Sequence, residues 1–170
     1  QSNLVSRINR IEERLILNGI SDPNRQITPR RVLLHTLAHA LIQELVIECG
    51  YTAASLKERI YANGHQAGLL IYTASPDADG TMGGLVEMAD TETFKRVLAT
   101  ALQGASWCSN DPVCMELGVH GQGPYGANLS ACHSCSLLPG TACEMFNLGL
   151  DRAVLVGDTL NPGLFNPFFK

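Results

Sequence analysis

The feature of this sequence that most constrains its fold is a cluster of cysteines in its second half. Five of the six cysteines lie between positions 108 and 143, and Cys49 stands apart. Cys132 and Cys135 form a CxxC pair, a spacing that lets both sulfurs point at one metal ion. Clustered cysteines in a chain that also contains long apolar helices favour a metal site in a reducing compartment over a secreted disulfide scaffold.

Zinc is the metal that this cluster favours, because closed structural zinc sites hold the ion with four ligands in a tetrahedron. Five cysteines are available for four positions, so one of them is spare. Our lead set consists of two pairs from two loops: Cys108, Cys114, Cys132 and Cys135. A rival set exchanges Cys108 or Cys114 for Cys143. A site of four thiolates has no open position for water or substrate, so it would stabilise the fold and not catalyse.

Two further interpretations of the cluster stay open at this point. His120 and His133 could substitute for a cysteine, although thiolates are plentiful. The CxxC pair could also be a redox motif or a pair of inert buried thiols. A redox CxxC is typical of the strand-to-helix junction of a thioredoxin-like unit, which the sequence does not predict here.

A nearly continuous apolar run from Val32 to Ile47 predicts the central element of the fold. Thr28-Pro29 is typical of a helix start, with Thr as the N-cap and Pro at the first helical position. Gly50 can provide a left-handed C-cap. A helix that is apolar almost all round is buried on most of its sides, so we expect this helix, ending near Glu48, at the centre of the molecule.

Shorter elements are expected around the central helix. The predicted elements are an amphipathic helix over 4–17, a short helix near 53–62 from the capping-box sequence Ser55-Leu-Lys-Glu58, a buried strand over 68–73, a helix from Asp90 or Thr91 to about Gln103, and a last helix over 142–156. The fold class is therefore α/β of the α+β, helix-rich kind: a buried central helix packed on a small sheet, with a cysteine-rich region held by zinc. We divide the chain into an N-terminal amphipathic helix and loop (1–27), the zinc-binding domain (28–157) and a C-terminal tail (158–170).

The composition is that of an ordinary folded domain. Hydrophobic residues make up 45% and charged residues 16% of the 170 positions, and the formal net charge is −4. An acidic balance argues mildly against a free-standing nucleic-acid binder. We identify neither an apolar stretch of about 20 residues, as a membrane span needs, nor a signal peptide, so the expected location is the cytoplasm with no membrane partner.

Basic residues are concentrated near the start of the chain. Six arginines fall in the first 31 positions: Arg7, Arg10, Arg14, Arg25, Arg30 and Arg31. The favoured interpretation is a solvated helix face. The alternative is a contact surface for a partner or a phosphate backbone.

The central helix carries a second group of candidate ligands. His35 and His39 are one helical turn apart and therefore share a face. Metallohydrolase helices of the HExxH kind have the same histidine spacing, but the glutamate that acts as general base is replaced here by Thr36. We favour a satisfied polar stripe. The alternative is a second metal site in which Asp77 or Asp79, from the loop after the predicted strand, joins the two histidines.

Three blocks of this sequence resemble a known family. They are Leu34-His-Thr-Leu-Ala-His-Ala-Leu41, Leu70-Ile-Tyr with Gly80-Thr-Met-Gly-Gly-Leu85, and Ala131-Cys-His-Ser-Cys-Ser-Leu-Leu-Pro-Gly-Thr-Ala-Cys143 with Asn147 and Leu150-Asp-Arg-Ala153. Together they resemble the C-terminal zinc-binding domain of MrfA-type superfamily 2 DNA helicases, and in particular its version in DrmB of the DISARM phage-defence system. In that family four cysteines bind zinc, which supports Cys132 and Cys135. The wider first pair here leaves the spare cysteine open, with Cys143 the first candidate and Cys114 the second.

The resemblance implies a non-catalytic accessory module of a helicase or antiviral defence complex. The chain has no Walker A sequence, so no ATPase activity is carried over and we do not expect an enzyme. The expected cofactor is Zn²⁺, and the expected partner is a helicase or another defence-complex protein. Two other functions stay open: a metal-dependent hydrolase or nuclease-like site at the histidine helix, and a DNA-contacting domain whose contact is weak or indirect.

Overall fold

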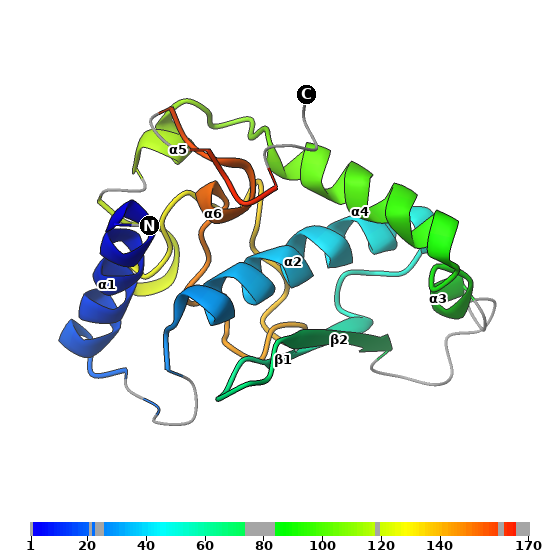
Figure 1. Cartoon of the computed structure of the whole chain (residues 1–170), viewed down its shortest axis with the longest axis horizontal. Helices are drawn as coiled ribbons and strands as arrows, with labels where there is room; N and C mark the ends of the chain where they lie inside the picture. The colour runs from blue at the N-terminus through cyan, green and yellow to red at the C-terminus, as the bar shows by residue number, and fades with distance from the viewer. Residues whose placement is uncertain are drawn as a thin grey trace.

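The computed structural model describes residues 2–20, 22, 26–73, 84–117, 120–159 and 162–165. Its elements, in chain order, are α1 (Ser2–Leu17), α2 (Pro29–Cys49), β1 (Leu56–Tyr61), β2 (Gly68–Thr73), α3 (Gly84–Glu87), α4 (Thr91–Ala105), α5 (Val113–Glu116), the 3-10 helix η3 (Pro124–Gly126) and α6 (Ala153–Val156). Figure 1 shows α2 running through the middle of the molecule, with the β1–β2 hairpin on one side of it, α4 on the other and α1 near its first turns.

The ends of the long helices follow local signals in the sequence. The Thr28 side chain accepts a hydrogen bond from the backbone amide of Arg31, and Gly50 has φ of 70°, so both predicted caps of α2 are confirmed. Asp90 caps α4 as expected. That helix ends at Ala105, two residues beyond the predicted end near Gln103.

Helix α2 is the core helix of the fold. Its buried residues lie on several faces: Arg31, Val32, His35, Thr36, Ala38, His39, Leu41, Ile42 and Leu45. By length and composition alone α2 could cross a membrane, contrary to our expectation that no stretch would meet this criterion. Its burial on several sides is that of the central helix of a folded domain.

Two main apolar clusters flank α2. One joins it to α1 and α6 through residues such as Ile11, Val32 and Leu155. The other joins it to β1 and α4 through residues such as Leu56 and Val97. Because both clusters use α2, the helix fixes the positions of the remaining elements and of the side chains that project from it.

Strand β1 occupies the segment for which the sequence predicted a short helix over 53–62, and that prediction is wrong. Leu56, Glu58 and Ile60 are buried and alternate with more exposed residues, which is the period of a strand. The strand pairs antiparallel with β2, with Leu56 opposite Thr73. Pairing and burial against α2 override the local capping-box signal. The strand predicted over 68–73 is confirmed in its bounds, but it is not the buried strand we expected, because none of its residues is buried. The helix-rich fold class with a small sheet on a central helix is confirmed.

The helix predicted over 142–156 is also wrong in most of its length, because only Ala153–Val156 is helical. The segment before it is held by Asn147, which has φ of 61°. Its side-chain oxygen accepts from the Leu138 amide at 2.8 Å and its side-chain nitrogen donates to the Leu138 carbonyl at 2.8 Å. Such side-chain bonds to the backbone compete with helix formation.

The hydroxyl of Thr36 provides a test of how α2 holds this irregular segment. It donates to the Val32 carbonyl at 2.7 Å and accepts from the Asp151 amide at 3.1 Å. Thr36→Val keeps the side-chain volume and leaves the buried Asp151 amide unpaired, which costs about 1–3 kcal/mol of unfolding free energy. Urea denaturation measures this loss.

The matched control is Thr100→Val in α4. Thr100 makes the same intrahelical bond, to the Arg96 carbonyl at 3.1 Å, but is exposed and accepts no tertiary hydrogen bond that the structure records in its described part. Its substitution should change stability by no more than about 0.5 kcal/mol. Equal losses in the two variants would contradict the role given to Thr36.

Candidate metal centre

Four cysteine sulfurs meet between the segment 108–114, whose end lies in α5, and the CxxC segment 132–135. The Sγ atoms of Cys108, Cys114, Cys132 and Cys135 all lie within 4.8 Å of one another. The measured separations are 3.6 Å for Cys108–Cys132, 3.8 Å for Cys114–Cys135 and 3.8 Å for Cys132–Cys135. Sulfurs bound at about 2.3 Å in a tetrahedron around zinc are about 3.8 Å apart. These residues therefore fit a zinc ion at the separations that the fold already sets.

Polar groups around the sulfurs orient them. The Asn110 backbone amide donates to Cys108 Sγ at 3.4 Å, and its side-chain amide donates to Cys132 Sγ at 3.4 Å. The Gln122 side-chain amide donates to Cys114 Sγ at 3.4 Å. Hydrogen bonds of this kind support metal-bound thiolates. The sequence does not predict these roles for Asn110 and Gln122, because an isolated polar residue gives no signal beyond its nearness to a cysteine.

The protonation of the thiols depends on what surrounds them. Burial raises the pKa of Cys108 to about 11, and burial together with the Cys135 charge also raises the pKa of Cys114. Burial opposes ionisation of Cys132 too, but hydrogen bonds from Asn110 and the Ser134 backbone outweigh it and lower its pKa to about 6. Burial and crowding keep Cys108 and Cys114 protonated while Cys132 ionises readily. A metal ion that replaces the protons would stabilise these thiols as thiolates.

A partly buried ion pair between Arg152 and Asp111 fixes the first cysteine segment to the rest of the fold. Asp111 accepts from the Cys108 backbone amide at 2.8 Å and from the Arg152 guanidinium at 2.7 Å. Arg152 also donates to the Ala105 carbonyl at the end of α4. The guanidinium thus carries a positive charge beside the thiolate cluster and connects it to α4 and α6.

Cys143 lies in a different group. It gathers with His35, His39 and Glu58, whose ligand atoms also lie within 4.8 Å of one another. Asp77 and Asp79, the predicted partners of the two histidines in a second metal site, both lie outside the described residues. Glu58 was missed because its segment was predicted to be a helix. The alternation of residues 56, 58 and 60 is the signal that could have placed it facing α2.

The other histidines considered as ligands lie outside both groups. His133 is exposed and lies 3.3 Å from the Ser134 hydroxyl through its Nε2 atom. His120 is exposed as well. Cys49 lies at the end of α2 and belongs to neither group.

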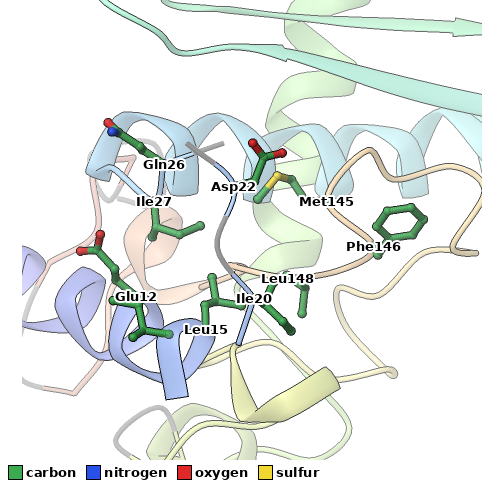
Figure 2. Close-up of a pocket in the computed structure, with 10 residues that line it drawn as sticks. Glu12, Leu15, Ile20, Asp22, Gln26, Ile27, Met145, Phe146 and Leu148 are labelled. Carbon is green, nitrogen blue, oxygen red and sulfur yellow. The ribbon is translucent and has the colours of Figure 1, made fainter. Parts of the chain in front are cut away.

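A pocket lies away from both clusters of candidate metal ligands. It has a volume of about 510 Å³ and lies between the end of α1 and the segment 145–148 (Figure 2). Its walls are mostly apolar, with Leu15, Ile20 and Leu148 among them, and no cysteine or histidine is among the described residues that line it. The carboxylates Glu12 and Asp22 on its wall belong to neither group of clustered ligands.

The thiolate cluster leads to a direct test of its role. Cys135→Ser removes one zinc ligand, and structural zinc sites contribute binding free energy on the order of 10 kcal/mol, which is comparable to the whole stability of a domain. We expect the variant to lose this zinc and to be unfolded at 25 °C, as measured by metal analysis and circular dichroism. Cys49→Ser is the control and should keep wild-type zinc and melting. A Cys135→Ser protein that melts like wild type with its zinc retained would contradict the role of the cluster.

Comparisons with known proteins agree with this geometry. A family model described as the MrfA Zn-binding domain matches residues 37–136, a range that contains all four clustered cysteines. The DISARM protein DrmB of Bacillus paralicheniformis is 42% identical over 139 residues, which cover 82% of this chain and 24% of that protein. The chain thus spans about a quarter of the length of this relative. The resemblance expected from the sequence blocks is confirmed: the chain belongs to the MrfA Zn-binding domain family, and its cofactor is zinc.

Proposed function

We propose that this chain is a non-catalytic, zinc-stabilised module that serves a DNA helicase or a phage-defence complex. The observation that carries the proposal is the closed set of four sulfurs at zinc spacing. Catalytic zinc sites keep a coordination position for water or substrate, whereas four thiolates fill the tetrahedron. Cys108, Cys114 and Cys132 are buried, so the ion would be enclosed by protein and would act on the fold itself.

The proposed setting follows from the relatives. One is named DISARM protein DrmB, and the matching family carries the name of MrfA. The chain contains no GxxxxGK[ST] sequence for binding nucleotide phosphates. We therefore assign motor activity to a partner or to another part of the same protein. The six unpaired thiols favour the cytoplasm, where thiols stay reduced.

A hydrolase centred on the histidine helix is supported less well. His35 and His39 are fully buried and face Glu58 and Cys143. A hydrolytic metal needs an approach for substrate and an open coordination position. In the described part of the chain the two imidazoles face the side chains of Glu58 and Cys143 and not an open channel. This favours a structural role for the group of His35, His39, Glu58 and Cys143 as well.

Direct DNA binding also receives little support from the N-terminal arginines. Arg7 donates to Asp151 at 2.7 Å and to Asp158 at 3.3 Å. Arg30 donates to the carbonyls of Gly64 and Gln66. Because these guanidinium groups hold segments of the fold together, they are poorly placed to neutralise phosphates, and any DNA contact is proposed to be weak or indirect.

The partner proposal is tested in the native host. The full-length protein that carries this chain is tagged, captured and analysed by mass spectrometry, as wild type, Cys135→Ser and Cys49→Ser. We expect a DNA helicase to co-purify at comparable yield with wild type and Cys49→Ser, and to be lost with Cys135→Ser because the docking module is unfolded. Wild-type protein that captures no helicase or defence protein would contradict the proposal.

The DNA alternative is tested with the zinc-loaded chain and a duplex oligonucleotide. Binding through phosphate contacts weakens steeply with salt, by a slope of about −0.9 in log K per contact. We expect no binding at micromolar protein in 50 mM salt, as measured by fluorescence anisotropy. Tight binding that disappears by 200 mM salt would favour a DNA-contacting domain over the accessory module.

A further inference from the structure

We propose that His35, His39, Glu58 and Cys143 form a second zinc site, separate from the four-cysteine cluster. The four side chains come from α2, from β1 and from the segment that follows the CxxC pair. Their residues are 1%, 0%, 2% and 3% exposed, respectively. Their ligand atoms lie within 4.8 Å of one another, although more than 100 positions separate the first from the last.

The protonation of His39 points to a cation between these groups. His39 Nδ1 lies 2.7 Å from the Ser136 carbonyl oxygen, which can only accept a hydrogen bond, so Nδ1 carries the proton. In the neutral ring the lone pair is then on Nε2, which lies 3.5 Å from Glu58 Oε1. Two acceptors that face each other in a buried site repel unless a proton or a metal ion lies between them, and a metal ion would also bind His35 and Cys143, whose ligand atoms lie at the same place.

The same atoms lack other partners. In the described part of the chain, His39 Nε2 and Glu58 Oε2 are buried without a hydrogen-bond partner, and Glu58 Oε1 lies 3.1 Å from His35 Nε2 without an assigned hydrogen bond. A buried carboxylate without a compensating positive charge or hydrogen bond destabilises the fold. These atoms are neighbours and lie close to one another, as the ligands of a single metal ion do.

The distances suit a small tetrahedral ion. His35 Nε2 lies 3.1 Å from Cys143 Sγ and 3.1 Å from Glu58 Oε1. Nitrogen, oxygen and sulfur ligands around zinc are about 3.3–3.6 Å apart, so small shifts of the side chains would complete the coordination. The Asn147 amide donates to Cys143 Sγ at 3.1 Å, which supports a thiolate at that position.

Charge and ligand type select zinc among the common ions. Two neutral imidazoles, one carboxylate and one thiolate bring a charge of −2, so a divalent cation makes the buried site neutral. Imidazole and thiolate suit zinc, whereas magnesium and calcium prefer oxygen ligands. Four protein ligands with no open position make the site structural.

The two sites would hold different parts of the fold. The four-cysteine cluster joins two loops, whereas the second group joins α2 and β1 to the segment after the CxxC pair. Ser136 connects them, because its carbonyl orients His39 and its neighbour in the chain is the ligand Cys135. A second zinc would therefore lock the cysteine-rich region onto the central helix.

The wild-type chain provides the first test. It is purified without added metal, dialysed against a weak chelator, and analysed by elemental analysis and zinc-edge X-ray absorption. We expect two zinc ions per chain. Five sulfurs and three nitrogen or oxygen ligands shared by two ions give a mean shell of about 2.5 sulfurs and 1.5 lighter atoms per zinc. One zinc per chain with a shell of four sulfurs would overturn the proposal.

Variants assign the second ion to these residues. Cys143→Ala should reduce the content from two zinc ions to one and leave a shell of four sulfurs. The control Cys49→Ser, which removes a cysteine outside both groups, should keep two ions and the mixed shell. Two tightly held ions and a mixed shell in Cys143→Ala would overturn the assignment. If that variant does not fold, the wild-type stoichiometry and shell decide the question.

Discussion

The meeting of four thiolates, from the segments 108–114 and 132–135, is the interaction on which the second half of this domain depends. Between the end of α4 and the start of α6 the described chain has only two very short helices, α5 and η3. A segment with so few regular backbone hydrogen bonds gains little stability from secondary structure. Cross-linking its loops through one ion supplies that stability, because the free energy of metal binding becomes free energy of folding.

The first half of the domain serves as the platform for this region. His35, Thr36 and His39 form a buried polar stripe on α2, and each of them contacts the segment between residues 136 and 151. His35 contacts Cys143, Thr36 accepts from the Asp151 amide, and His39 contacts the Ser136 carbonyl. The stripe is therefore the interface between a helix held by hydrophobic packing and a segment held by ligands and hydrogen bonds.

The sequence predicts those parts of the molecule whose signals are local. Thr28-Pro29 and Gly50 mark the ends of α2, and the CxxC spacing indicates a metal site, because in both cases the physical cause lies within a few residues. The five clustered cysteines leave the grouping open, since thiols far apart in sequence give no information about which of them meet. The structure separates Cys143 from the other four.

The wrong predictions have non-local causes. Glu58 faces the core, so the inward side of β1 contains a charged residue, and the alternation that marks a strand was hidden. Once the strand was missed, the partner of the two histidines was missed with it. Similarly, Asn147 replaces a predicted helix by bonding to the Leu138 backbone, a contact that only the folded chain reveals.

Hydrogen–deuterium exchange of the zinc-loaded and metal-stripped chain tests the central claim most directly. If zinc holds the cysteine-rich region together, stripping the metal should abolish the protection of backbone amides across residues 108–143. Protection should also fall along α2, whose polar stripe would lose its partners. Unchanged protection across 108–143 after complete removal of zinc would contradict the account, because the fold would then stand without the metal.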